Sequence, residues 1–250
     1  MIKKCLLRHF FLFSLVMYRP AFAYQNTTRF WTFILFLIPL LSLWGQDVSE
    51  QTKPLFREDQ FYVGVSFMLL QTNQDQFDPL GLSRHFQWGF VRDIPLNDSG
   101  KLASAVGLGM SFERYNTNLE RSLDEFNKAS YSFNSAISSP LFFSVHSLEL
   151  PLSIRWRNAA PESFAFWRVY GGVSLRWNYY NKLMQDKEQI RNIEDLNPFG
   201  TVAHLSFGYN TWNFYIAYHL SPFFNTDSIS TGSIPFELNP IKIGLIFYIL

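Results

Sequence analysis

The sequence is short of cysteine and of charge. Its one cysteine, Cys5, excludes a framework of disulfide bonds. Charged residues make up 16% of the 250 residues and the net charge is +1, so the chain has no basic excess with which to bind nucleic acid. Mean hydropathy is near zero, which excludes a membrane protein built from many helices. These absences exclude a disulfide-stabilised domain, a nucleic-acid-binding protein and a membrane protein built from many helices.

Aromatic side chains are abundant instead. They account for 18% of the residues, with 27 Phe, 12 Tyr and 7 Trp. Many aromatic residues combined with unremarkable hydropathy are typical of strands in which apolar residues that face lipid alternate with polar residues that do not. The composition therefore favours a membrane β-barrel.

The first 45 residues differ from the rest of the chain. They hold five basic residues and no acidic residue, and apolar runs at Phe10–Tyr18 and Phe30–Trp44 each follow basic residues. Both runs are shorter than the ~20 residues of a membrane helix. We predict that residues 1–45 are a signal peptide cleaved before Gln46. Met17 would then be a possible true start, with residues 1–16 an extension from gene annotation, and a tandem membrane anchor remains the alternative.

The remainder reads as a polar lead-in followed by strands. Residues 46–59 are expected to lie in the periplasm. Eight segments then alternate apolar and polar residues, the pattern of a strand with one apolar face. They are residues 60–72, 83–94, 101–116, 143–157, 164–181, 198–209, 212–220 and 235–250. At residues 143–157, Arg155 and Arg157 share the face opposite the leucines, as only a strand arranges them.

The gaps between the strands alternate in length. Gaps after the odd-numbered strands span roughly 10, 26, 16 and 14 residues, and the others roughly six, six and two, as in outer-membrane barrels with long outer loops and short periplasmic turns. In the longest gap, Leu119–Lys128 is interpreted as a helical turn or two. The predicted fold is all-β, an eight-stranded antiparallel transmembrane β-barrel with up-and-down meander topology over residues 60–250, closed by pairing of the first and last strands.

The alternation assigns each side chain to lipid or to the lumen. In the last strand, Ile241, Ile243, Leu245, Phe247 and Ile249 are predicted to face lipid. Aromatic girdles at the two interfaces are expected to hold Tyr62, Trp88, Trp156, Trp177, Tyr179, Trp212 and Tyr218. The predicted lumen network is Glu113, Glu149, Arg155, Arg157, Arg168, Arg176, His204, His219 and Lys242. Its glutamates are expected to bridge the arginines in a packed structural plug; a polar path for a small solute or ion is the alternative.

The sequence offers no catalytic, cofactor or metal site. Arginines around Glu113 and Glu149 would keep both carboxylates ionised, which does not suit a general acid. His146, His204 and His219 invite a metal, but no carboxylate or cysteine completes a set of ligands. We therefore predict a protein that is not an enzyme, without cofactor or metal. An outer-membrane enzyme remains the least favoured hypothesis.

Three phrases resemble the PorT family of small outer-membrane barrels of the Bacteroidetes phylum. They are Trp88–Asn97 (WGFVRDIPLN), Ser147–Arg157 (SLELPLSIRWR) and Phe166–Gly172 (FWRVYGG), and the likeness covers about residues 58–250. The Glu-x-Pro phrase is shared by many barrels of that phylum, whereas Arg-Asp-Ile-Pro-Leu-Asn is more particular to the PorT type.

The resemblance implies a barrel in the bacterial outer membrane that supports type IX secretion or gliding motility. It provides no catalytic motif. The expected partners are outer-membrane lipid and other components of the secretion system, contacted through the outer loops, chiefly residues 117–142, or through turns such as residues 93–100. The alternative is a generic small barrel with a structural, adhesion or minor solute-passage role.

Overall fold

The structure is a computed structural model that describes residues 59–72, 77–79, 81–126, 128–133, 141–158, 166–185, 188–225 and 238–249. The predicted signal peptide, almost all of the predicted lead-in and the first residues of the predicted last strand lie outside these ranges. Among the residues described, no helix is both long and apolar enough to cross a membrane.

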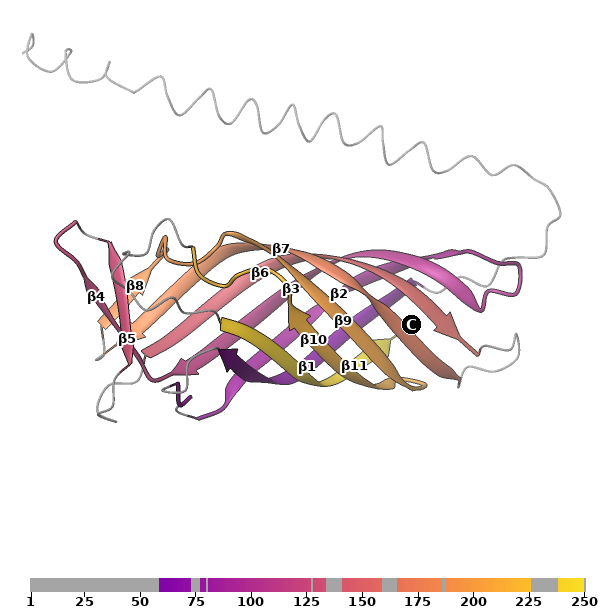
Figure 1. The fold of residues 1–250 in the computed structure, drawn as a ribbon. Coiled ribbons are helices and arrows are strands. Elements are labelled where there is room, and N and C mark those ends of the chain that lie inside the picture. Colours follow the sequence, from indigo (N-terminus) through magenta and orange to yellow (C-terminus); the bar gives the residue numbers. More distant parts are fainter. Residues whose placement is uncertain are drawn as a thin grey trace, which may run out of the picture. The chain divides into compact units, whose positions relative to one another are not determined.

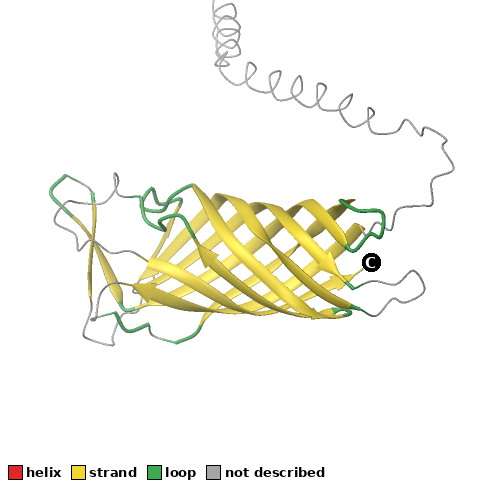
Figure 2. Ribbon diagram, turned by 45° about the vertical axis from the view of Figure 1, so that its right-hand side comes forward, coloured by secondary structure: helices red, strands yellow, loops and turns green. Residues whose placement is uncertain are grey.

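Eight strands form a closed antiparallel barrel, so the predicted fold is confirmed (Figures 1 and 2). The strands of the wall are β1 (Asp59–Thr72), β2 (Ser83–Pro95), β3 (Leu102–Thr117), β6 (Leu141–Arg157), β7 (Trp167–Gln185), β9 (Phe199–Tyr209), β10 (Trp212–His219) and β11 (Leu238–Ile249). Each pairs with the next in the chain, and β1 closes the ring on β11 from Phe61↔Ile249 to Thr72↔Leu238. Closure leaves neither β1 nor β11 as a free edge of the described wall, which a bilayer requires because it offers no water to unpaired backbone groups.

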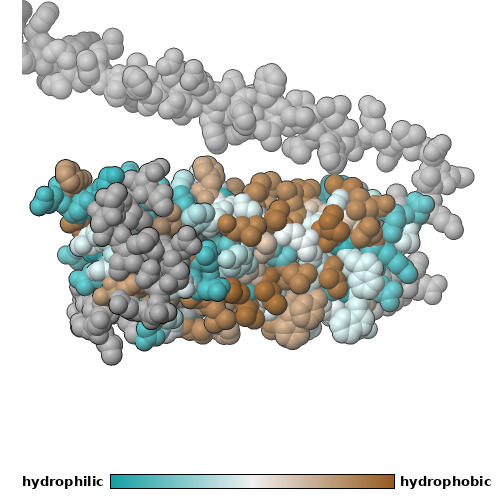
Figure 3. All heavy atoms as spheres, in the orientation of Figure 1, coloured by the Kyte–Doolittle hydropathy of each residue, from teal (hydrophilic) through white to brown (hydrophobic). Residues whose placement is uncertain are grey.

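Side chains of the wall alternate between an apolar outside and a polar inside. In β1, Phe61, Phe67 and Leu69 are more than half exposed, whereas the intervening Ser66 and Met68 are buried. The outward facing predicted for the last strand is confirmed, since Ile243 and Ile249 are exposed on either side of buried residues. Figure 3 shows apolar side chains gathered around the middle of the barrel, with polar ones towards both ends. Such a band is what a bilayer covers.

The height of the apolar band follows from β2. Its outward positions between Arg92 and Arg84 hold Phe86, Trp88 and Phe90. Eight residues rising ~3.4 Å each, on a strand tilted by ~40°, span about 20 Å along the barrel axis, close to the ~25 Å of outer-membrane barrels. The arginines therefore mark the two edges of the band.

Aromatic side chains also lie at both edges. Trp156, Trp167 and Trp212 are exposed near the short turns, and Trp177, Tyr179 and Tyr218 are exposed towards the long loops. Two of the girdle expectations are wrong. Tyr62 is only 5% exposed and lies inside, and Trp88, although exposed, lies midway between Arg84 and Arg92 in the apolar band. A Cβ at Gly109 would collide with the Tyr62 hydroxyl, so the glycine makes the room that the ring occupies.

The two ends of the barrel differ. The short-turn end has tight connections, such as Asn210 and Thr211 between β9 and β10, where Asn210 adopts a φ of 55°. The long-loop end carries a separate hairpin of β4 (Leu119–Leu123) and β5 (Ala129–Phe133), and β8 (Glu188–Arg191), which folds back on β7. Figure 1 shows these strands gathered at one end of the barrel.

The helical turn expected within Leu119–Lys128 is wrong. Leu119 pairs with Phe133 and Leu123 with Ala129, so the segment is the first strand of a hairpin. Leu119 and Ala129 are both buried against the barrel end. Tertiary packing of alternate residues overrides a weak helical propensity here.

An arginine on the lipid face tests this assignment of faces. Leu152→Arg should lower the free energy of unfolding by about 2–4 kcal/mol, because the charge would lie within the hydrocarbon. Leu96→Arg, at an exposed turn position outside the band, is the matched control and should change it by less than about 0.5 kcal/mol. Urea unfolding of the protein in lipid vesicles measures both, and equal losses would contradict the facing.

Candidate functional site

The lumen holds all nine residues singled out from the sequence. Eight of them are buried: Glu113, Glu149, Arg155, Arg157, Arg168, Arg176, His219 and Lys242. His204 is half-buried. The nine do not form one network, because the structure divides the charged residues between the middle of the lumen and the short-turn end.

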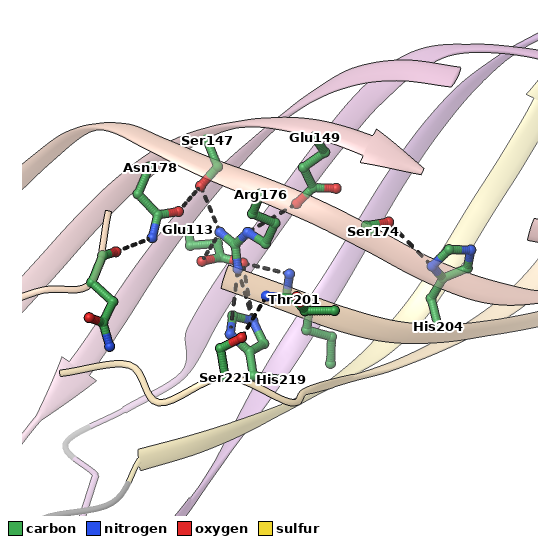
Figure 4. Close-up of polar contacts among 12 residues, drawn as sticks. Glu113, Ser147, Glu149, Ser174, Arg176, Asn178, Thr201, His204, His219 and Ser221 are labelled. Atoms are coloured by element: carbon green, nitrogen blue, oxygen red, sulfur yellow. Dashed lines mark hydrogen bonds and ion pairs between the residues drawn. The ribbon is translucent and has the colours of Figure 1, made fainter. Parts of the chain in front are cut away.

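Glu113 is the hub of the group in the middle of the lumen (Figure 4). Its Oε2 accepts a hydrogen bond from Arg176 Nη2 at 2.7 Å and one from the Tyr115 hydroxyl at 2.6 Å. Its Oε1 lies 2.5 Å from Lys242 Nζ. The second carboxylate, Glu149, reaches Arg176 Nε at 3.3 Å. Two carboxylates thus face two cations, so the charges of this buried group balance.

Asp93 is the hub of the group at the short-turn end. It accepts hydrogen bonds from Arg155 Nη1 at 2.9 Å and from Arg157 Nη1 at 2.6 Å. Arg155 also donates to Gln60 Oε1 at 2.9 Å, and its guanidinium lies 4.3 Å from the centre of the Tyr170 ring. The glutamates predicted to bridge the arginines therefore contact Arg176, whereas Arg155 and Arg157 bind an aspartate that the sequence analysis missed.

The signal for Asp93 was present in the sequence. Asp93 has the same parity along its strand as Gln87 and Gly89, which alternate with the apolar Phe86, Trp88 and Phe90 and therefore belong to the inner face. The remaining arginine, Arg168, lies in this region with its guanidinium 4.5 Å from the centre of the Phe166 ring.

The histidines do not converge. His204 Nδ1 lies 3.3 Å from the Ser174 hydroxyl and His219 Nε2 lies 3.0 Å from Arg176 Nη1, whereas His146 faces outward against Phe112. In the part of the chain that the structure describes, no three His, Cys, Asp or Glu side chains are grouped to hold a metal ion.

An apolar cluster fills the lumen at the long-loop end. Its buried members are Met68, Tyr115, Leu119, Ala129, Tyr131, Leu141, Phe143, Val145, Leu183, Ile193, Leu196, Phe223, Phe224 and Leu238. They come from the wall, from the β4–β5 hairpin and from the loops near Ile193 and Phe223. Below them, two spaces in the lumen have volumes of about 20 Å³ each, enough for roughly one water molecule. Among the described residues, the lumen is therefore closely packed at these two levels.

Asp195 ties the β4–β5 hairpin to the barrel end. Its carboxylate accepts hydrogen bonds from Arg121 Nε and from the Tyr131 hydroxyl, both at 2.6 Å, and it is buried. Burial, reinforced by the Asp195 carboxylate, raises the pKa of the Tyr131 hydroxyl, so the phenol stays a donor. A cleft of about 330 Å³ lies beside this clamp, lined by Arg121, Leu183, Gln185, Glu188 and Ile190. The long-loop end is therefore a built surface, which we call the platform: β4, β5, β8 and the Asp195 clamp.

Comparison with known proteins gives a likeness of fold. No family model matches the sequence, and no curated protein matches it. A solved structure of Ail, the attachment invasion locus protein of Yersinia pestis, in complex with the heparin analogue sucrose octasulfate, is similar with 11% identity and a TM-score of 0.35, over 77% of this chain and 99% of that chain. A second Ail structure gives 11% identity and a TM-score of 0.33, over 76% and 97%. At this identity the likeness extends to the fold alone and assigns no residue a role.

Removing Asp93 tests the group at the short-turn end. Asp93→Ala should lower the free energy of unfolding by about 3–5 kcal/mol, because it leaves two buried guanidinium groups without their carboxylate. Asp59→Ala is the control, since Asp59 is 4.0 Å from Arg92 in an exposed pair that contributes less than about 1 kcal/mol. Urea midpoints in vesicles compare the two, and a small effect of Asp93→Ala would refute the role of this carboxylate as hub.

Removing Asp195 tests the clamp. Asp195→Ala should release the β4–β5 hairpin without opening the wall, because the hairpin pairs only within itself. Hydrogen exchange should then speed up across residues 119–133 and stay unchanged in the middle of β7. Glu120→Ala, which alters an exposed carboxylate on β4, should leave both rates unchanged. Unchanged exchange in Asp195→Ala would show that apolar packing alone holds the hairpin.

Proposed function

We propose that the protein is a sealed barrel of the bacterial outer membrane that acts as a scaffold, holding the platform at the cell surface for adhesion or for assembly with a partner. The observation that carries this is the Asp195 clamp, which fixes a hairpin above the wall. The hairpin ends in two exposed apolar side chains, Leu123 at 54% and Phe126 at 84% exposure. Exposed apolar residues on a fixed element suit a protein interface better than bulk water.

The packing of the lumen argues against solute passage. The apolar cluster and the mid-lumen charges occupy the cross-section of a barrel whose interior is just wide enough for side chains. A hydrolytic role also lacks support, because Glu113 and Glu149 both contact Arg176. A carboxylate held by a guanidinium is a poor general acid.

Support of type IX secretion is the second candidate. It rests on the resemblance to the PorT family and on the exposed Ile94 and Leu96, at 43% and 53%, which in this orientation would face the periplasm. The phrases of the resemblance also supply Asp93, Arg155 and Arg157 to the buried group. A structural role therefore accounts for those three positions without any secretion partner.

Site-specific crosslinking in intact cells separates the two candidates. A photoreactive amino acid at position 126 samples the platform, and the same residue at position 96 is the matched control at the other end of the barrel. We expect a protein adduct from position 126, lost in an Asp195→Ala background because the hairpin is released. An adduct from position 96 alone, together with reduced export of secreted cargo in a deletion strain, would replace the scaffold proposal by the secretion role.

A further inference from the structure

The outer face of the wall carries cations beyond the apolar band. Arg84 on β2 lies directly opposite Arg114 on β3, and Arg114 is followed across the sheet by Ser144 on β6 and Lys182 on β7. Lys182 in turn lies opposite Arg191 on β8. Leu183, beside Lys182, is buried in the lumen, so Lys182 points outward. We call Arg84, Arg114, Lys182 and Arg191 the cationic row.

The row places like charges face to face. Directly opposed residues of an antiparallel pair have Cβ atoms about 4.5–5.5 Å apart, and like charges there destabilise the sheet. Arg84–Arg114 and Lys182–Arg191 are two such pairs, separated by the small Ser144. Within the described residues none of the four cations has an ion-pair partner. The repulsion within these two pairs would therefore be offset by anions that bind from outside the chain.

An apolar groove lies below the first pair. It has a volume of about 450 Å³, and its apolar walls are Val65, Phe67, Phe86 and Phe112, with Arg84 and Arg114 along it. Its border also includes Ser144 and His146, and Ser66, His85 and Glu113, whose buried side chains belong to the inner face. The Arg114 guanidinium is held 4.8 Å from the centre of the Phe142 ring, nearer the long-loop end. Apolar walls with guanidinium groups above them match an amphiphile that has acyl chains and a phosphate headgroup.

We infer that the cationic row and its groove bind the phosphorylated lipid A of lipopolysaccharide. The inference rests on the outward orientation in the proposed function, because lipopolysaccharide forms the outer leaflet of the bacterial outer membrane. Arg84 lies at the long-loop edge of the apolar band, about 20 Å above Arg92, which is the depth of the outer headgroups. Arginine binds phosphate oxygens in bidentate geometry, and two adjacent arginines suit a lipid that carries more than one phosphate.

Lipid binding by the purified full-length protein in nanodiscs tests the inference. We compare the wild type with Arg84→Gln/Arg114→Gln, and with Arg92→Gln as the matched control at the other edge of the band. Fluorescent lipid A should bind the double variant about tenfold to thirtyfold more weakly, and the control as the wild type does. Dephosphorylated lipid A should bind all three equally weakly.

The urea midpoint of unfolding gives a second readout, because the double variant should change it in opposite directions without and with lipid A. In nanodiscs of neutral lipid, Arg84→Gln/Arg114→Gln should raise the urea midpoint, because it removes a like-charge pair. With lipid A present the same variant should lower the midpoint relative to the wild type, because the bound phosphate stabilises only the wild type. Heat-shifted migration in detergent gels confirms that each variant has folded.

Three results would overturn the inference. Equal loss of binding in Arg92→Gln would mean diffuse attraction to an anionic surface. Equal binding of phosphatidylglycerol would mean a site for any anionic lipid, and unchanged binding in the double variant would place lipid A elsewhere. These results are independent of the scaffold role, because a cysteine at position 123 labelled from outside intact cells reports the orientation by itself.

Discussion

The structure depends on closure of the sheet between β1 and β11. In hydrocarbon every backbone N–H and C=O must find a partner within the protein, so one unpaired edge would cost several kcal/mol for each exposed group. The pairing of Phe61–Thr72 with Leu238–Ile249 removes both edges at once. The register of this pairing also matters for facing. If one strand shifted by one residue against its neighbour, its lipid-facing side chains would point into the lumen.

Closure around eight strands then constrains the interior. The lumen is narrow, so polar side chains that point inward lose water and need partners from other strands. Glu113 meets that need from the middle of the wall and Asp93 from the short-turn end. These contacts join strands that are not neighbours in the sheet, as in the bond from Arg155 on β6 to Gln60 on β1. The same groups that pack the lumen therefore also hold the barrel in register.

The sequence predicts the wall better than the ends. Period-two alternation gives the strands and the inward position of each lumen residue, and the same alternation places Asp93 inside. Arg84 and Arg114 lie opposite each other in strands joined by a short connection of residues 96–101, so their opposition too follows from a local pairing. The placement of the β4–β5 hairpin does not, because its clamp joins Arg121 to Asp195 across 74 residues. No local pattern encodes a contact between two loops.

The wall carries cations on its inner face and on its outer face, and the two groups differ in whether the chain supplies a carboxylate to balance them. Inside, Arg155, Arg157 and Arg176 are buried, and each has a carboxylate within 3.3 Å, because nothing else could balance it there. Outside, the cationic row has no such carboxylate among the described residues, yet its members oppose one another across the sheet. Arginine at the edge of a bilayer keeps its charge in the headgroup layer, where water and anions are available. The chain thus supplies its own counter-charges where lipid and water are excluded, and under the lipid A proposal the headgroups supply them outside.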